Sequence, residues 1–525
     1  MNNRKLYKMK NPKVLTMLLF SGILLLSSCV KEDDLEQTDP NVDTSVSFWE
    51  DDQDALLGVN SVYGSLLTDG TYMRSTPILL DLKGDDSRSM SPWASMYNVG
   101  RFNTSIGDPA IYGWAYETYY QGIYRANQVL ENVPEIEMED QALKDRIIGQ
   151  AHFLRGLYLF HAVNLFRNVP VPLTTEIYHE QRTPDVAWAQ VMEDFRIASE
   201  MLPLNYEDVT GLDEGQVGRA TKGAALAYLG KAQLFNQDFD TARETFKSVI
   251  DLGVYSLVDD YQDNFTLQNE NNSESIFEVQ FSREAGGVDL GWGGEPAAAW
   301  GKTSARAITY APRAFGFTDA QPTWTLFEEF MKEKTVDGED DPRLNVTIAW
   351  NDPNGYSLYG NEFSEFYAAS PADLNDIFIN KYQNSGGDRT DEYDWRSGIN
   401  ERIFRYADLL LMYAETLNET GDTNLAYDYV QMVRDRVNLP DLRSVKPNMS
   451  KQEMHEQIAH ERFLELALEG HRFDDLRRWG WVTSRLDWLI ERDPEFQTFQ
   501  PGREYFPIPQ VEVDNNPGTQ QNPGY

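Results

Sequence analysis

The sequence is poor in cysteine, since its 525 residues include one, Cys29. A single cysteine excludes intramolecular disulfides and any zinc site built from several thiolates. The fold must therefore be held by a hydrophobic core and polar contacts, and 41% hydrophobic content with 12% aromatic residues is typical of a folded chain. Because one core rarely exceeds about 250 to 300 residues, we expect one large composite domain or two.

Basic residues are also scarce. Lys and Arg number 46 against 84 Asp and Glu, which gives a formal net charge of −38. Residues 1–28 contain five of the cations and no acidic residue, so their removal takes the net charge from −38 to −43. A surface of this sign repels phosphate backbones and anionic headgroups. We therefore expect no nucleic-acid partner, whereas a neutral ligand such as a sugar meets no such penalty.

The N-terminus lacks an apolar run long enough to cross a membrane, which takes about 20 residues. The run at 14–26 is shorter, follows five basic residues and is soon followed by the charged stretch KEDD at 31–34. This layout is typical of a secretory signal. The sequence LSSC at 26–29 resembles a lipobox, in which small residues admit the signal peptidase and the thiol accepts a diacylglycerol.

An ordinary cleaved signal peptide with a chance cysteine is the alternative, but the only thiol stands where a lipid would attach. Several acyl chains hold a protein firmly at a membrane, whereas one does so only marginally. We predict a lipoprotein signal peptide at 1–28, lipidation at Cys29 and an acidic tether at 29–47. The acidic run after Cys29 is either an export signal to the outer leaflet or a solvated linker.

Helical periodicity dominates the remaining chain, 48–525. Residues 151–166 place apolar side chains on one helix face before Pro170 ends the helix. Residues 224–252 and 406–437 each predict two helices around a short turn, with small residues at tetratricopeptide-like offsets, and residues 186–202 add a further helix. One such pair cannot bury its own apolar face, so about three must stack. We predict a mainly α fold, an α/α superhelical scaffold of tetratricopeptide-like helical pairs over 48–255 and 401–525.

Residues 256–400 differ from this pattern, because they are rich in Gly, Asn, Asp and aromatics and contain short strand-like runs such as 275–281. We interpret them as an irregular, loop-rich insertion with short strands, carried on the helical scaffold. Loops on a rigid scaffold are where binding tends to reside. The insertion is therefore the predicted ligand-binding region.

Enzymatic motifs fail on spacing. His455-Glu456 is followed by His460, one residue too far for a zinc-protease helix, and Gly301-Lys302-Thr303 lacks the earlier glycine of a phosphate loop. No G-x-S-x-G elbow occurs, and the acidic run at 337–341 lacks calcium-loop spacing. Counting carboxylates alone leaves a glycosidase acid pair open. We predict a binding protein, not an enzyme, with no cofactor and no metal.

Aromatic residues in irregular stretches are the candidate ligand contacts. A pyranose ring packs its C–H face on the face of an indole or phenol, with polar groups around the rim. Four residues meet this description: Trp93 and Tyr97 in a loop-like stretch, and Trp292 and Trp300 among glycines. In contrast, four tryptophans in helical patterns predict core packing, namely Trp188, Trp324, Trp479 and Trp488. The aromatic cluster at 112–120 suits core or interface equally.

Three blocks together resemble the SusD/RagB family: YADLLLMYAE at 406–415, ERFLEL at 461–466 with EGHRFDDLRRWG at 469–480, and FPIP at 506–509 through QNPGY at 521–525. The lipobox and scattered helical pairs agree over essentially the whole chain, and 256–400 matches least well. We interpret the charged residues of these blocks as structural, since Glu461, Arg462, Glu465, Glu469 and Arg472 recur at helical spacings that favour ion pairs.

The resemblance implies an outer-membrane lipoprotein that captures oligosaccharides without chemistry. Such proteins cap a SusC-type TonB-dependent transporter and move like a lid over its barrel. Some relatives handle peptides instead, so a peptide-capturing protein is the alternative. Ligand aromatics in the family come from roughly the regions of Trp93 and Trp292, although no motif fixes their positions here.

Overall fold

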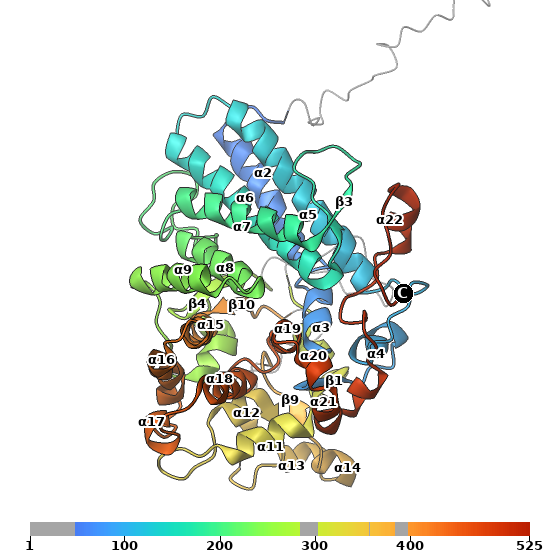
Figure 1. Ribbon diagram of the computed structural model, residues 1–525, viewed down its shortest axis with the longest axis vertical. Coiled ribbons are helices and arrows are strands. Elements are labelled where there is room, and N and C mark those ends of the chain that lie inside the picture. Colours follow the sequence, from blue (N-terminus) through green and yellow to red (C-terminus); the bar gives the residue numbers. More distant parts are fainter. Residues whose placement is uncertain (1–47, 284–302, 356, 384–396) are drawn as a thin grey trace, which may run out of the picture. The chain divides into compact units, whose positions relative to one another are not determined.

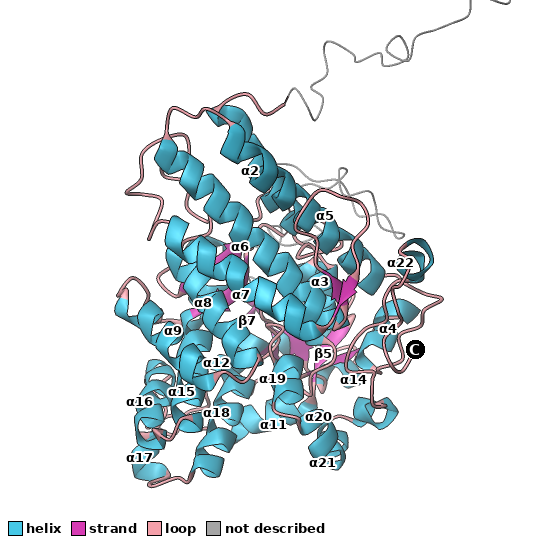
Figure 2. Cartoon of the chain, turned by 45° about the horizontal axis from the view of Figure 1, so that its top comes forward, coloured by secondary structure: helices cyan, strands magenta, loops and turns pink. Residues whose placement is uncertain are grey.

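The computed structural model describes residues 48–283, 303–355, 357–383 and 397–525. The chain divides into two compact units, Met1–Glu50 and Asp51–Tyr525. Helices make up most of the second unit, and its strands are short (Figures 1 and 2). The predictions for residues 1–47, Cys29 among them, lie outside the described residues. No helix of the described part is long and apolar enough to cross a membrane.

The first half of this unit is a stack of helices, each in contact with the next from α5 to α9. Helix α6 is its centre: Asp140 caps its first turn by accepting from the Leu143 N–H at 3.0 Å, and the helix ends before Val169-Pro170. Both flanks of α6 are covered, so side chains around most of its circumference are buried. The members of the stack are α2 (Asp52–Gly64), α5 (Tyr112–Asn132), α6 (Gln141–Phe166), α7 (Pro184–Met201), α8 (Lys222–Phe235) and α9 (Phe239–Asp251).

Helices α8 and α9 form the helical pair predicted from residues 224–252. Asp238 caps α9 through the Thr241 N–H. Gly230 permits the close crossing, because a Cβ there would lie 2.7 Å from a ring carbon of Phe246. Small residues at these offsets therefore set the distance between the paired helices.

The second predicted pair is α15 (Tyr406–Glu419) and α16 (Thr423–Arg436), joined at Gly421 with a φ of +97°. Helix α9 packs against α15, and Arg243 forms a 2.5 Å ion pair with Asp422. Helix α18 (Lys451–Glu465) packs on α15 and α16. Pairs far apart in the sequence thus join into one continuous helical scaffold, as predicted (Figure 1).

The described parts of 256–400 contain short strands and five short α-helices. Strand β4 (Ser275–Val279), expected from the sequence, pairs antiparallel with β10 (Glu401–Arg405), which leads into α15. The sheets of the described residues have two strands each. The others pair β1 (Ser87–Ser89) with β5 (Ala320–Pro322), β2 (Val169–Pro170) with β3 (Gln181–Arg182), β6 (Ile348–Ala349) with β9 (Phe378–Ile379), and β7 (Ser357–Leu358) with β8 (Asn361–Glu362). The helices are α10 (Arg306–Tyr310), α11 (Trp324–Lys332), α12 (Arg343–Thr347), α13 (Phe363–Tyr367) and α14 (Pro371–Leu374).

The C-terminal segment returns to the first half of the chain. The Phe506 N–H donates to the Leu165 carbonyl at 2.8 Å, and the Asn522 side chain donates to the Phe166 carbonyl at 2.6 Å. The segment comprises α19 (Arg472–Arg478), α20 (Trp481–Ser484), α21 (Leu486–Arg492), the 3-10 turn η8 (Pro494–Thr498) and α22 (Gln510–Asn515). It thereby packs near α3 (Ser75–Asp81) and residues 101–104.

Candidate functional site

Helix α4 (Ala94–Gly100) presents two aromatic residues and an arginine in a row. Trp93 is its N-cap, Tyr97 follows four residues later, and Arg101 is its C-cap. Residues four apart share a helix face. Tyr97 is 41% exposed and Trp93 is half-buried, so both candidates from the sequence reach the surface. The stretch is a short helix rather than the loop we expected.

Trp93 packs against Trp114 of α5. The two rings lie with centroids 5.8 Å apart at an interplanar angle of 34°. The guanidinium carbon of Arg74 is 5.5 Å from the Trp93 centroid and 5.7 Å from the Trp114 centroid. Trp114 is half-buried, so the pair forms a partly exposed aromatic surface with a cation against it. We name Trp93, Trp114, Arg74 and Tyr97 the aromatic platform.

Asp69 fixes the arginine of the platform. Its two carboxylate oxygens each accept from Arg74, at 2.6 Å from Nε and 2.6 Å from Nη2. This bidentate geometry is the strong form of a carboxylate–arginine pair. Because Asp69 neutralises Arg74, the guanidinium packs against the platform rings without adding net positive charge.

Tyr97 has its own cation. The guanidinium carbon of Arg101 lies 3.4 Å from the Tyr97 ring centroid, and Nη1 donates to the Tyr97 carbonyl at 3.2 Å. Glu495 of η8 forms a 2.6 Å ion pair with Nη2 of Arg101. One face of the Tyr97 ring is therefore covered by the guanidinium, and the exposed part of the side chain is what a ligand would meet.

The described ends of the insertion adjoin this platform. The Ala305 N–H donates to the carbonyl of Met73, next to Arg74, at 2.8 Å. Ser304 and Ser397 form an antiparallel bridge. The Met90 N–H donates to the Asp319 carbonyl at 2.8 Å. The insertion is thus anchored beside the platform, while Trp292 and Trp300 themselves lie outside the described residues.

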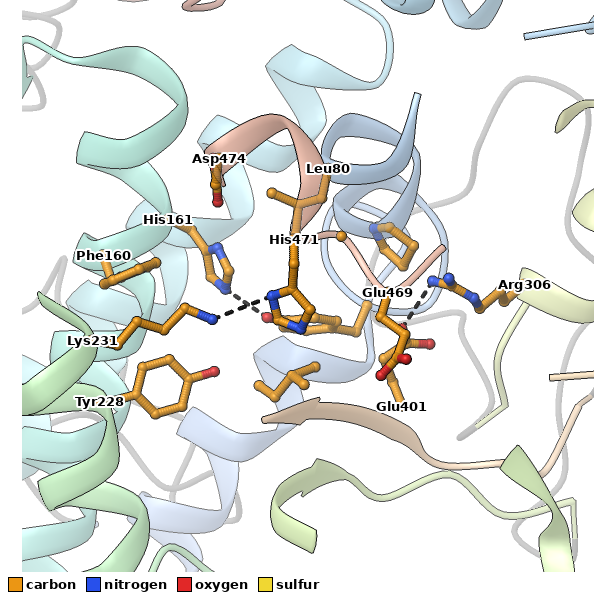
Figure 3. Close-up of a pocket in the computed structure, with 14 residues that line it drawn as sticks. Leu80, Phe160, His161, Tyr228, Lys231, Arg306, Glu401, Glu469, His471 and Asp474 are labelled. Carbon is orange, nitrogen blue, oxygen red and sulfur yellow. Dashed lines mark hydrogen bonds and ion pairs between the residues drawn. The ribbon is translucent and has the colours of Figure 1, made fainter. Parts of the chain in front are cut away.

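A second group of polar residues surrounds an internal cavity between α3, α6, α8 and the start of α19 (Figure 3). Lys231 contacts His471 Nδ1 at 3.4 Å, and His161 Nε2 is 2.6 Å from the Tyr72 hydroxyl. Burial and the Lys231 charge lower the pKa of His161 to about 3 and that of His471 to about 4. Burial also raises the pKa of Glu401 to about 7.

Groups with pKa values shifted this far are typical of catalytic sites. The small size of the cavity, however, argues against ligand binding in it. Its volume is about 30 Å³, whereas one probe sphere of water takes about 10 to 15 Å³ and ligand pockets begin near 300 Å³. The space suits one or two buried waters and no sugar ring. This cavity is therefore too small to hold the expected ligand.

The charged residues of the C-terminal blocks have a structural role, with different partners from those the sequence suggests. Helical spacing does give the pairs Arg477–Asp474 and Arg478–Asp475 in α19, but Glu461, Arg462, Glu465, Glu469 and Arg472 do not pair with one another. Glu461 pairs with Arg343 at 2.7 Å and with Arg434 at 3.0 Å, both from other elements. The remaining pairs also reach other segments: Glu465 to Arg405 and Arg436, Glu469 to Lys381, Arg462 to Asp408, and Arg472 to Asp85.

The other sequence predictions concern metal binding and four tryptophans in helical stretches. Among the described residues no group of three His, Cys, Asp or Glu side chains could hold a metal ion. Trp188, Trp479 and Trp488 are half-buried, but the core assignment of Trp324 is wrong, because it is 43% exposed. It is the first residue of α11, where a side chain can point outward. Sequence reasoning missed Arg74, Trp114 and Arg101 as platform residues, and the aromatic cluster at 112–120 was the only signal for Trp114.

Comparison with known proteins gives the family of this helical scaffold. A model described as "SusD family" matches residues 273–525, and one described as "Starch-binding associating with outer membrane" matches residues 59–234. Two models of one kind thus match most of the chain. The chain belongs to the SusD family.

Individual relatives agree along their whole length. A SusD-like protein of Formosa agariphila is 26% identical over 94% of this chain and 96% of its own. The crystal structure of a SusD superfamily protein from Bacteroides vulgatus is 28% identical with a TM-score of 0.79, covering 91% of this chain and 100% of that one. A structure named "Laminarin binding SusD-like protein" is 27% identical with a TM-score of 0.72 over 91% and 100%.

Proposed function

We propose that this chain is a cell-surface lipoprotein that binds neutral oligosaccharides at the aromatic platform. The observation that carries the proposal is the Trp93–Trp114 pair, held under Arg74 and followed by Tyr97 on the same helix face. Aromatic faces bind the apolar C–H face of a sugar ring, and the buried guanidinium of Arg74 packs against both tryptophan rings. The titles of solved relatives support a glycan ligand, since one is a laminarin-binding protein and another, 22% identical, is in complex with laminarihexaose.

We further propose the location and the partner. Lipid on Cys29 would anchor the protein in the outer membrane, with residues 29–47 as the tether, and the protein would deliver its ligand to a SusC-type TonB-dependent transporter that it covers as a lid. The description of the matched family model, which associates its members with the outer membrane, supports this location. In this role the protein binds and hands over its ligand without chemistry and without a cofactor.

The insertion completes the proposed site. Its described ends adjoin Met73 and Met90, beside the platform. Trp292 and Trp300 stay predicted ligand contacts on the strength of their aromatic, glycine-flanked sequence.

A ligand panel tests the proposal. The purified chain without residues 1–28 is titrated calorimetrically with neutral oligosaccharides, including laminarihexaose, and in parallel with peptides of similar length. We expect saturable heat with at least one neutral glycan and none with the peptides. Binding of peptides alone would replace the proposal by the peptide-capturing alternative, and appearance of shorter sugars during the titration would show that the protein is an enzyme.

A further inference from the structure

We infer that Glu495 is a positioning residue for the platform: through Arg101 it fixes the Tyr97 ring in the orientation that the ligand meets. The inference rests on the proposed function and adds to it a residue almost 400 positions away in the sequence, on a different element. Glu495 belongs to η8, and its side chain is 8% exposed in its 2.6 Å ion pair with Arg101.

Residues of η8 and of the segment after it donate hydrogen bonds to the chain just after α4. The Thr498 hydroxyl donates to the Arg101 carbonyl, and Nη1 of Arg503 donates to the Thr104 carbonyl at 3.0 Å. Glu495 itself is held by its own N–H, which donates to Asp493 at 3.0 Å. These contacts fix the backbone of the segment that carries Glu495 beside the end of α4.

Gly100 provides the room for this contact. A Cβ at Gly100 would lie 2.6 Å from Oε2 of Glu495 and 2.9 Å from the Leu82 carbonyl. The carboxylate thus lies directly on the C-terminal end of α4, where unsatisfied carbonyls disfavour a negative charge. Arg101 resolves this conflict, because it pairs with Glu495 while its Nη1 donates to the carbonyls of Tyr97 and Ser89.

The flat face of the Arg101 guanidinium packs on the Tyr97 ring. With Nη1 on two carbonyls and Nη2 on Glu495, its plane is fixed, and the ring lies 3.4 Å away. Without this contact, the Tyr97 side chain, which is 41% exposed, would populate several rotamers. Ordering it before the ligand arrives lowers the entropic cost of binding.

The charged groups around Glu495 affect the pH at which its ion pair with Arg101 forms. Arg101 and Arg88 face it as cations, Asp493 faces it as an anion, and Asp85 acts on Asp493. Burial, followed by the Asp493 charge, raises the pKa of Glu495 to about 7, and burial raises the pKa of Asp493 to about 6. Only ionised Glu495 pairs with Arg101. The Glu495–Arg101 ion pair therefore strengthens as the pH rises through about 7 and is lost as the pH falls below this value.

The variant Glu495→Gln tests the inference, with Glu491→Gln on α21 as the control that removes the same charge from an exposed position. Titration with laminarihexaose at about pH 6 and about pH 8 should show that wild type binds roughly twofold to fivefold more tightly at the higher pH, the range of a partly exposed ion pair. We expect Glu495→Gln to bind with the weaker affinity at both pH values, and Glu491→Gln to follow wild type.

Two further measurements separate positioning from simple stability. In a Tyr97→Ala background Glu495→Gln should have no added effect on affinity, because the residue acts through the ring. A ligand-free crystal structure of Glu495→Gln should show the Arg101 guanidinium displaced from Tyr97. An unchanged Arg101–Tyr97 geometry, or an affinity loss that persists fully without the Tyr97 ring, would overturn the inference. That structural result also stands if wild type binds no sugar, an outcome that would overturn the proposed function instead.

Discussion

Arg343 and Glu461, 118 residues apart in the chain, form a 2.7 Å ion pair in which neither side chain is exposed. Arg343 also contacts Asp341 at 2.7 Å and Glu465 at 3.1 Å, so one cation from the insertion holds three buried carboxylates. Burial of such charges is costly unless each is paired. The residues of the family blocks thereby join the insertion to α18.

Removal of this cation should be strongly destabilising. We expect Arg343→Met to lower the free energy of unfolding by about 3 to 5 kcal/mol, because uncompensated carboxylates remain buried. Urea unfolding followed by circular dichroism measures the change. Arg443→Met is the matched control, since Arg443 and Asp428 form an exposed pair, 40% and 52% accessible, and it should cost less than about 1 kcal/mol. Equal effects of the two variants would contradict the structural role of Arg343.

The platform makes a prediction for ligand affinity. Trp93→Ala and Trp114→Ala should each weaken glycan binding about tenfold or more, or about 1.4 kcal/mol, through loss of a stacking face. Isothermal titration measures this, and thermal unfolding shows whether the fold is intact. Trp324→Ala, which removes a 43% exposed tryptophan from α11, should leave affinity unchanged. If Trp324→Ala alone weakened binding, the site would lie elsewhere.

The crossing of α8 and α9 depends on Gly230. A Cβ at this position would be 2.7 Å from the Phe246 ring, so Gly230→Ala should destabilise the protein by about 1 to 3 kcal/mol through overpacking. Gly64→Ala is the comparison, because nothing lies within 4 Å of its Cβ and alanine favours a helix. Differential scanning calorimetry should give a lower Tm for the first variant and an equal or higher Tm for the second. The reverse order would refute this account of the helix crossing.

Asp86 should make the stability of the protein depend on pH. Burial, opposed by a hydrogen bond from the Leu468 N–H at 2.9 Å, raises its pKa from 3.8 to about 7. Between these two values the folded protein holds a proton that the unfolded chain has released, so stability falls as pH rises from about 4 to about 7. Asp86→Asn keeps the acceptor and removes the titration. Its Tm should drop less between about pH 5 and about pH 8 than that of wild type, and parallel profiles would argue against the assignment.

The anchor predicted at Cys29 separates location from binding. Cys29→Ala should abolish retention at the cell surface, measured by protease accessibility and membrane fractionation. The secreted variant should bind glycan with wild-type affinity, because the platform belongs to Asp51–Tyr525. Loss of binding by the soluble variant would show that the two functions are not independent.

Local patterns in the sequence predicted much of the fold. Helices α8, α9, α15 and α16 follow from periodicity and small residues, because these signals act over three to four residues. Helix α4 was expected as a loop, since seven residues give too short a pattern. Trp324 was assigned to the core from its helical setting, yet its position at the start of α11 leaves it outside.

The platform was only half predictable, for a physical reason. Trp93 and Tyr97 are visible in the sequence as clustered aromatics, but Arg74, Trp114 and Glu495 join them through tertiary contacts. The partners of Glu461 and Glu465 are similarly distant. Spacing rules for a helix surface describe exposed pairs, whereas these carboxylates are buried and receive cations from whichever element is packed against them.

The contact between α9 and α15 forms late during synthesis of the chain, because the two helices are far apart in the sequence. Residues 252–405 separate the two helices, and synthesis at about 5 to 20 residues per second needs roughly 8 to 30 seconds to cover that stretch. Closing so long a loop has its own entropic cost, which grows slowly with length. Until α15 emerges, the α5–α9 stack ends in the surface that α15 will cover. A nascent chain stalled in that interval offers chaperones this particular surface of α9.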